Sequence, residues 1–381
     1  DAQESRGLGD VYKRQDHGSK HDWNFDVMVG KFGNPVIGIR IKNMVEQYSA
    51  DPDLYLQYHT LLNQIVATLG EGHLLQKLDI FSKRQYAAEP SNQFLQQKYS
   101  EHFEGRVYKS IETVLLFTDI IEQKKKKTSY SFSEKNYKDL RDRCQKIFML
   151  LSQYHCEPKF LREKDFEYYV GGSLSMNFVQ NPVFDNIYSN NEFLRIGKQF
   201  VKTISYVDVE RIELPSEIEP YSLLGGNNAS SDTAVDNFSF INELEDYNTI
   251  IYNQIISIPI QTQRQRDLEK KKKKHEGVAN SAPSNAIVAA EIDELLHNVT
   301  VDGQLIVDAH FSIVYSADSL DRMEETQSLI ESKLFTKGIN ISKNAFNQLE
   351  LFRCCLPGNA VELKDYDLFT TTSEAALCFF F

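Results

Sequence analysis

The chain has 381 residues, enough for about two domains, and its composition of 41% hydrophobic and 25% charged residues is typical of a globular protein. Its 24 Phe and 19 Tyr residues exclude a mainly disordered chain, because such chains are poor in aromatic residues. The formal net charge of −12 argues against a protein that coats nucleic acid, because neutralising phosphates requires a basic surface. One local basic patch remains compatible with this charge.

The five cysteines are odd in number and show no CxxC spacing. A reducing, cytoplasmic compartment is therefore predicted rather than a disulfide scaffold. No run of about 18 apolar residues occurs, so the sequence predicts no membrane-spanning helix.

Both ends of the chain depart from an ordinary folded pattern. Residues 1–15 show no periodicity, and their GLGDVYKRQ stretch resembles translated sequencing-adaptor DNA, so we expect this tail to be non-native. The other end is the apolar run Leu377–Phe381, which we expect to need a continuing strand or helix for its burial. We therefore predict a fragment truncated at its C-terminus. The alternative is an apolar terminus tucked into a core.

Residues 16–123 are predicted to form a first α+β subdomain with the element order β-β-α-β-α-β. Glycines between two short apolar runs indicate a hairpin, and helical spacing of apolar residues indicates the helix that follows. The elements expected are strands over Asn24–Val29 and Pro35–Ile41, a helix over Asp51–Leu69, a strand over Leu74–Phe81, a polar helix over Gln93–Phe103 and a strand over Lys109–Ile121.

Residues 124–245 are predicted to be a helical and mixed connecting region. It opens with a polar break at Lys124–Lys127, and a helix with one apolar stripe follows over Glu134–Tyr154. The pattern from Cys156 to Tyr206 is mixed and assigns no elements. Residues 221–237 are expected to be a long loop, because they are rich in Gly, Asn and Ser.

Residues 246–381 are predicted to form a second α+β subdomain, interrupted by a polar helical excursion over 261–299. The elements expected are strands over Asn248–Ile258 and Leu305–Tyr315, excursion helices over Gln261–Glu276 and Ile287–Val299, a helix over Ser319–Phe335, a helical or mixed segment over Asn344–Arg353 and a tight turn over Leu356–Asn359. The fold class predicted for the chain is α+β, with mixed or antiparallel sheets, helices packed on one face, and two α/β subdomains. No exact sequence repeat is found.

No motif for catalysis, cofactor binding or metal binding is found. A phosphate-binding GxxxxGK[ST] loop and a GxGxxG loop are both missing, and the glycine pairs Gly171-Gly172 and Gly225-Gly226 are interpreted as turns. The nine histidines do not form the i, i+4 pair of a zinc hydrolase. The vicinal Cys354-Cys355 pair is interpreted as two small buried hydrophobes.

Two lysine runs, Lys124–Lys127 and Lys270–Lys274, are the strongest departures from the acidic composition. Runs of one charge are usually solvated, and that is one interpretation of both. The other is contact with anionic headgroups or an acidic partner. The residues proposed for such a contact are Lys270, Lys271, Lys272, Lys273 and Lys274.

The C-terminal thirty residues carry a resemblance to a known family. The run LFRCCLPGNAVELKDYDLFTTTSEAALCFF resembles the segment in TraG-like conjugation ATPases of conjugative transposons where a PGN turn precedes an aromatic-T-T-x-x-A-L-x-F-F pattern. Upstream, HFEGRVYKSIETVLLFTD is similar to a helix-to-strand passage of that family. The matching residues of the C-terminal motif are Pro357, Gly358, Asn359, Phe369, Thr370, Ala376, Leu377, Phe379 and Phe380.

The resemblance implies the N-terminal region of a type IV secretion ATPase. A complete family member would continue into a motor domain that binds ATP and Mg²⁺ and energises DNA transfer or pilus assembly. The region seen here would dock the motor, which self-associates, onto inner-membrane subunits at the cytoplasmic face. It implies no ATP, Mg²⁺ or catalytic residue within this chain. The lysine-rich excursion is the part that matches the family least.

Two other classes of function remain open. One is a stand-alone adaptor, or an enzyme with an active site of unrecognised type in the Asn- and Tyr-rich region Tyr168–Phe193. The other is a nucleic-acid-binding module, which the acidic charge disfavours and the lysine runs support. Salt-dependent DNA binding would distinguish the second.

Overall fold

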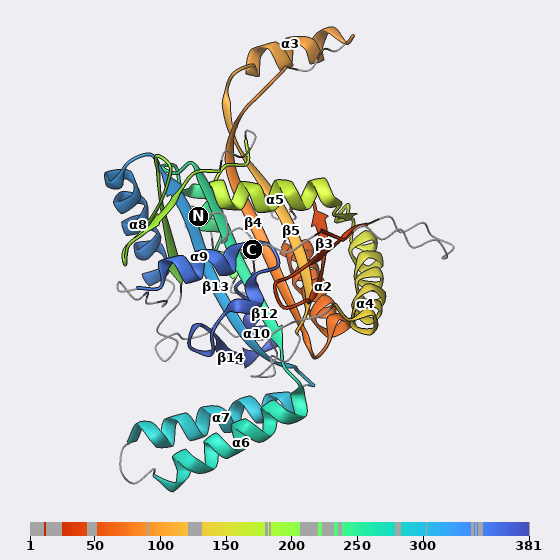
Figure 1. The fold of residues 1–381 in the computed structure, drawn as a ribbon, viewed down its shortest axis with the longest axis vertical. Helices are drawn as coiled ribbons and strands as arrows, with labels where there is room; N and C mark the ends of the chain where they lie inside the picture. Colours follow the sequence, from red (N-terminus) through yellow and green to blue (C-terminus); the bar gives the residue numbers. More distant parts are fainter. Residues whose placement is uncertain are drawn as a thin grey trace.

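Twelve strands pair into one antiparallel sheet, shown in a computed structural model (Figure 1). Ten of them lie in the order β1-β2-β3-β5-β4-β12-β13-β9-β8-β7, while β6 pairs with β3 and β14 pairs with β13. The structure describes residues 11–12, 25–43, 52–88, 90, 92–120, 132–179, 182, 184–205, 220–222, 232–234, 238–278, 283–301, 303–336, 339, 341 and 346–380.

The strands of the sheet come from both ends of the described chain. Their bounds are β1 Val11–Tyr12, β2 Val27–Val29, β3 Pro35–Ile41, β4 His73–Gln85, β5 Val107–Asp119, β6 Lys159–Phe160, β7 Ile187–Ser189, β8 Leu194–Ile196, β9 Gln199–Ser205, β12 Thr249–Ile258, β13 Ile306–Ala317 and β14 Phe369–Thr372. A separate hairpin pairs β10, Pro220–Ser222, with β11, Asp232–Ala234.

The two halves of the sheet repeat one architecture. From the centre outwards, β4, β5, β3, β2 and β1 mirror β12, β13, β9, β8 and β7, in strand order and in chain order. The central strands β4 and β12 are antiparallel, so a local two-fold axis between them relates one half to the other. The two halves therefore share one topology, although the sequence contains no exact repeat.

Helices cover both faces of this sheet. The bounds are α2 Pro52–Leu69, α3 Phe94–Phe103, α4 Glu134–Gln153, α5 Glu163–Ser175, α6 Gln261–Gly277, α7 Pro283–Val301, α8 Leu320–Phe335, α9 Gln348–Cys355 and α10 Ser373–Leu377, with the 3₁₀ turns η3 Ser239–Glu243, η5 Ala360–Glu362 and η6 Asp365–Asp367. One buried cluster joins the sheet to α2, α4, α8 and α10. A second buried cluster joins the opposite face to α5 and α9.

This arrangement confirms the α+β class and the antiparallel pairing, and it corrects the expectation that the helices pack on one face. Alternate residues of β4 point to opposite faces: Leu75 and Phe81 belong to the first cluster, and Leu78 and Ile80 to the second. Because both faces of the central strands are apolar, each must be covered. The predicted subdomain boundaries and the non-native status of residues 1–15 remain predictions.

Local signals explain where several helices begin and end. The side chains of Ser133 and Ser319 accept hydrogen bonds from backbone N–H groups in the first turns of α4 and α8. Gly70, with φ of +70°, follows α2 in a conformation that favours glycine. The helix predicted over Ser319–Phe335 is confirmed as α8, and the excursion over 261–299 is confirmed as α6 and α7.

Two arms project from the sheet at opposite ends (Figure 1). One is the end of the β4–β5 hairpin with α3, residues 83–109, called here the α3 arm. The other is the helical hairpin between β12 and β13, residues 261–301, called here the α6–α7 arm. The two connections occupy equivalent positions in the two halves. Because β4 and β12 run in opposite directions, equivalent insertions leave the sheet at opposite ends.

The apolar C-terminal run is buried over its described residues, Leu377–Phe380. Phe379 stacks on Phe311 with ring centroids 4.9 Å apart, and Phe380 is 3% exposed. The Tyr252 hydroxyl donates a hydrogen bond to the backbone carbonyl of Phe379 at 2.7 Å. For Leu377–Phe380 the expectation that a further segment is needed for burial is therefore wrong, because the α2 face of the sheet covers these residues. Phe381 lies outside the described residues.

Candidate functional site

The α6–α7 arm holds the lysine cluster that the sequence singles out. Helix α6 carries seven Lys or Arg residues and three Asp or Glu, whereas α7 carries three acidic residues and no Lys or Arg. The arm therefore has one basic helix and one acidic helix. Its base is fixed to β13, because the Gln261 amide exchanges two hydrogen bonds with the backbone of Ile306 at 2.8 and 2.9 Å.

Only one lysine of the cluster faces the partner helix. Lys272 is paired with Asp293 of α7 and with Glu276 of α6, and its side chain is 26% exposed. The hydrogen bond from Lys272 to Asp293 raises the pKa of the lysine. Lys270 is 76% exposed and paired with Asp267 within α6. Lys272 therefore serves the helix pairing. The residues left on the outer face are Lys270, Lys271, Lys273 and Lys274.

The α3 arm is a second exposed surface, which the sequence analysis missed. Helix α3 was expected as a polar helix, and its span agrees closely with the expectation. The structure places it at the end of a projecting hairpin, where its apolar residues have no sheet beneath them (Figure 1). Phe94, Leu95 and Tyr99 are 70%, 81% and 64% exposed. The sequence does offer one signal for this exposure. A helix that lies between two strands of one hairpin has to sit beyond the end of that hairpin.

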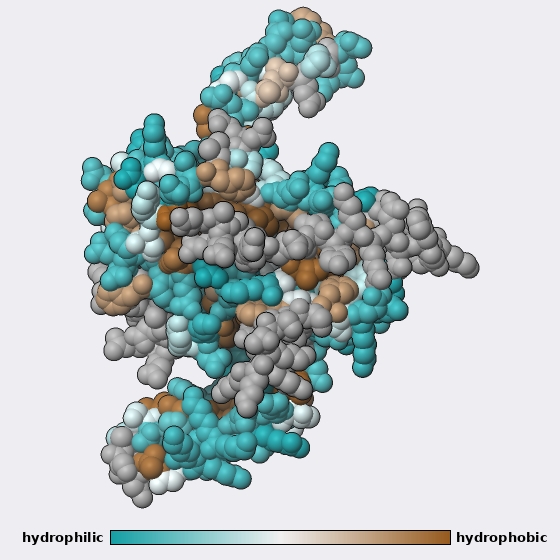
Figure 2. Space-filling model, in the orientation of Figure 1, coloured by the Kyte–Doolittle hydropathy of each residue, from teal (hydrophilic) through white to brown (hydrophobic). Residues whose placement is uncertain are grey.

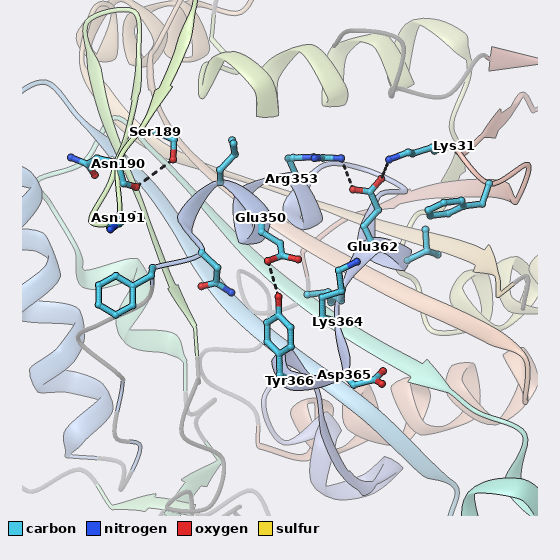
Figure 3. A pocket seen from close by; sticks show the side chains of 16 residues that line it. Lys31, Ser189, Asn190, Asn191, Glu350, Arg353, Glu362, Lys364, Asp365 and Tyr366 are labelled. Carbon is cyan, nitrogen blue, oxygen red and sulfur yellow. Dashed lines mark hydrogen bonds and ion pairs between the residues drawn. The ribbon is translucent and has the colours of Figure 1, made fainter. Parts of the chain in front are cut away.

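A hollow of about 910 Å³ lies beside α9, η5 and η6 (Figure 3). One of its carboxylates is already paired: Glu362 accepts from Lys31 at 3.1 Å and from Arg353 at 2.6 Å. The Tyr366 hydroxyl donates to Glu350 at 2.9 Å, and this hydrogen bond raises the pKa of Tyr366 to about 12. The phenol therefore stays protonated at neutral pH, and the hollow presents a polar binding surface rather than an activated nucleophile.

The region considered for an enzyme site, Tyr168–Phe193, includes α5 and the β7–β8 turn. Tyr168 and Tyr169 both donate to Glu112 of β5, at 3.0 and 3.1 Å. Burial, with the Glu112 charge second, raises the pKa of Tyr168 to about 12. Glu112 is also paired with Arg84 of β4. These contacts fasten α5 to the base of the α3 arm, which is a structural role.

The cysteines and His310 are buried groups without an activated side chain. All five cysteines are buried, and for Cys354 and Cys355 this agrees with their interpretation as small buried hydrophobes. Burial raises the pKa of Cys156 and of Cys354 to about 12, so both thiols stay protonated at neutral pH. Burial also lowers the pKa of His310 to about 4, and its ring lies 2.8 Å from the backbone carbonyl of Asp367.

The second lysine run, metal sites and membrane-spanning helices were also considered from the sequence, and each is compared here with the described residues. Lys124–Lys127 lies outside the described residues. Among the residues that are described, no group of three or more His, Cys, Asp or Glu side chains is arranged to hold a metal ion. In the same part of the chain, no helix has the length and apolarity required to span a bilayer.

Comparison with known proteins gives a context for these surfaces. Residues 234–361 match the model of the CagE, TrbE, VirB family, described as a component of the type IV transporter system. The match indicates a type IV secretion component. No curated protein matches the chain. The matched residues run from the end of β11 through β12, the α6–α7 arm, β13, α8 and α9 to η5. The family model thus covers the arm that carries the lysine cluster.

Proposed function

We propose that this chain is the docking and assembly region of a type IV secretion ATPase of the TraG-like conjugation type. In this proposal a motor domain encoded beyond Phe381 hydrolyses ATP with Mg²⁺, self-associates, and energises DNA transfer or pilus assembly. The chain described here holds that motor against inner-membrane subunits at the cytoplasmic face. The observation that carries the proposal is the family match over residues 234–361.

The fold is consistent with a docking role. Its chemically distinct surfaces are the two arms and the polar hollow, whereas the tyrosines Tyr168 and Tyr366 donate hydrogen bonds to carboxylates and stay protonated at neutral pH. Arms that leave opposite ends of one rigid sheet are suited to hold two different partners apart. No residue of this chain is assigned to ATP or Mg²⁺.

The basic face of α6 is the proposed contact for an acidic subunit of the secretion complex. Lys270, Lys271, Lys273 and Lys274 project from a helix whose own neighbour α7 is acidic. Lysines exposed along one helix face attract an acidic surface and increase the rate of association. Lys272 is excluded from this contact because it pairs with Asp293.

The proposal is tested first by sequencing the coding region beyond Phe381. A GxxxxGK[ST] motif that follows a predicted strand supports the ATPase, and a stop codon directly after Phe381 contradicts it. The second test is a conjugation assay with Lys270, Lys271, Lys273 and Lys274 changed to Glu. We expect transfer to fall at unchanged protein level. The matched control changes Lys135, Lys138 and Lys146, which are exposed on α4, to Glu, and transfer should be retained.

A further inference from the structure

A small apolar slot adjoins the polar hollow and shares part of its lining with it. The volume of the slot is about 240 Å³. Its floor is formed by Leu74 of β4, Ile120 at the end of β5 and Ile255 of β12, and its walls are formed by the β2–β3 turn and by η5 with the residues that follow it. Of the described residues that line the slot, only Asn34 and Ser257 are polar and none is charged.

The two walls of the slot are held in place by hydrogen bonds. Just before η5, the backbone N–H of Gly358 donates to the side-chain oxygen of Gln76 in the sheet at 3.1 Å. Lys31 in the β2–β3 turn donates to Glu362 of η5 at 3.1 Å, and Figure 3 shows the two side chains pointing toward each other. This bond fastens one wall to the other. The slot is therefore formed before any ligand enters it.

Unpaired polar atoms lie at one side of the slot. Asn34 is 1% exposed, and neither its Oδ1 nor its Nδ2 has a hydrogen-bond partner. Its amide lies against Gly30, where a Cβ would meet Oδ1 at 2.6 Å, so the glycine leaves the space that the amide occupies. Thr118 of β5 pairs directly with Leu74 and shares its face of the sheet, and its hydroxyl is also unpaired. Buried polar atoms without a partner are costly, so this group indicates a missing partner.

We propose that the slot binds a small neutral molecule that has an apolar body and one carboxamide-like group. A carboxamide donates through its NH₂ group and accepts through its carbonyl oxygen, so it complements both polar atoms of Asn34. The apolar body displaces water from Leu74, Ile255 and Leu363. Drug-sized ligands occupy pockets of about 300–1,000 Å³. The slot is smaller than that range, so its ligand is smaller than a typical drug.

The lining argues against water alone and against a charged ligand. A buried water needs about two to four polar partners, whereas most of the slot is apolar. A charged group would be buried without compensation, because no lining residue is charged. The nearest cations of the adjoining hollow, Lys31 and Arg353, both pair with Glu362.

The slot differs from the exposed apolar residues of α3. On that arm hydrophobic residues are scattered among hydrophilic ones (Figure 2), and Tyr99 already packs on Phe103. The slot instead encloses its occupant between the sheet and two walls, and combines apolar lining with a few polar atoms. That composition is typical of a small-molecule site. The inference goes beyond the docking role and does not depend on it.

The test is an NMR titration of the purified 381-residue chain, isotope-labelled at its isoleucine methyl groups, with cyclohexanecarboxamide. We expect the methyl resonances of Ile120 and Ile255 to shift, and that of Ile330, in the core on the other face of the sheet, to stay in place. Methyl cyclohexanecarboxylate accepts hydrogen bonds but cannot donate them, so it should bind about tenfold more weakly. The charged cyclohexanecarboxylate should bind more weakly still.

Asn34→Leu is the informative variant, because it keeps a side chain of similar size and removes both polar atoms. It should bind the carboxamide about tenfold more weakly and the ester as the unchanged chain does. Asn191→Leu is the matched control, because Asn191 is exposed and lines the adjoining hollow instead. It should bind both compounds like the unchanged chain. If Asn34→Leu does not fold, the comparison of the three compounds on the unchanged chain decides.

Each other outcome overturns the assignment. Absence of shifts at Ile120 and Ile255 with the carboxamide removes the slot as a site for this class of ligand. Equal affinity for the carboxamide and the ester removes the recognition by Asn34. Loss of carboxamide binding in Asn191→Leu, with binding retained in Asn34→Leu, moves the ligand to the hollow. None of these results bears on whether a motor motif follows Phe381, so the proposed function is judged separately.

Discussion

Lys77 of β4 and Gln254 of β12 lie opposite each other at the centre of the sheet, with 3.3 Å between Nζ and Oε1. On the other face, Gln76 donates to Asn253 at 3.0 Å. Both pairs are separated by 177 residues. The same offset is expected when a local two-fold axis passes between the two strands. Buried polar side chains thus mark the line along which the two halves of the sheet join.

The polar cluster around Lys77 is fully buried and internally paired. Asp79 is ion-paired with Lys77 and accepts hydrogen bonds from Gln254, from Thr113 at 2.6 Å and from Asn43 at 3.3 Å. An unpaired charge at such a position is costly, because no water reaches it. The cluster also favours one register, since a slip of one residue would move every side chain to the other face.

We therefore predict that Asp79→Ala lowers the free energy of unfolding by about 3–5 kcal/mol, because it leaves the Lys77 ammonium buried without its carboxylate. The double variant Lys77→Met with Asp79→Leu should recover most of that loss, because it removes both charges. Urea denaturation followed by circular dichroism measures both. If the double variant is as unstable as Asp79→Ala, an unpaired charge is not the cause.

The sequence predicts the central elements better than their assembly. The apolar runs of β12 and β13 and the spacing of α8 are strong local patterns, and the structure places these elements close to the predicted bounds. The pairing of β4 with β12 joins segments far apart in the chain, and no local pattern specifies it. Lys77, Asp79 and Gln254 are charged or polar residues inside buried strands, and residue type alone does not indicate their burial.

The exposed surfaces of α6 and α3 are likewise predicted only in part from the sequence. The lysine run on α6 is visible in the sequence, but the different role of Lys272 depends on where α7 lies. The apolar residues of α3 are interspersed with polar residues, so the sequence does not single them out. Their exposure depends on the hairpin that carries α3 away from the sheet. Helix α5 was not assigned because its Gly171-Gly172 pair weakens a helical pattern. The structure nevertheless uses Gly172 for close packing against Phe178.

The second prediction concerns Lys272 and the α6–α7 pairing. Lys272→Glu places a negative charge beside Asp293 and Glu276, so the two helices should separate more readily. We expect faster cleavage within residues 261–301 in limited proteolysis, at an unchanged melting temperature of the body. Lys271→Glu, one residue away on the exposed side, is the matched control and should be cleaved at the original rate. Equal acceleration in both variants would show that the arm responds to net charge alone.

The third prediction concerns the PGN turn. Gly358 has φ of +74°, and a Cβ there would overlap the Cε of Met28 and approach Val36 at 3.1 Å. Its backbone N–H also donates to the buried Gln76 amide oxygen at 3.1 Å. Gly358→Ala should therefore destabilise the protein by about 2–4 kcal/mol, through backbone strain and overlap together.

Gly105 provides the control for that experiment. Its φ is +76°, and a Cβ there would meet no atom within 4 Å. Gly105→Ala should cost only the backbone strain, about 1 kcal/mol. Urea unfolding of the two variants separates the two contributions. Equal losses would show that the overlap with Met28 is relieved by movement of its flexible side chain.

The fourth prediction is a pH dependence of stability from His310. Burial lowers its pKa to about 4 in the folded chain, against 6.5 for an exposed histidine. Below pH 6.5 the unfolded chain takes up a proton that the folded chain does not, so stability falls as the pH falls towards 4. The expected slope is about 1.4 kcal/mol per pH unit, or on the order of 3 kcal/mol over the window.

His310→Asn is the informative variant, because its amide can donate to the Asp367 carbonyl without titrating. Burial also raises the pKa of Asp367, and that group acts in the opposite direction at lower pH. It is present in both proteins and cancels in their difference. Urea unfolding between pH 7 and pH 4 should therefore show the unchanged chain losing stability faster than the variant. Parallel curves would mean that His310 takes up its proton equally in the folded and unfolded chains.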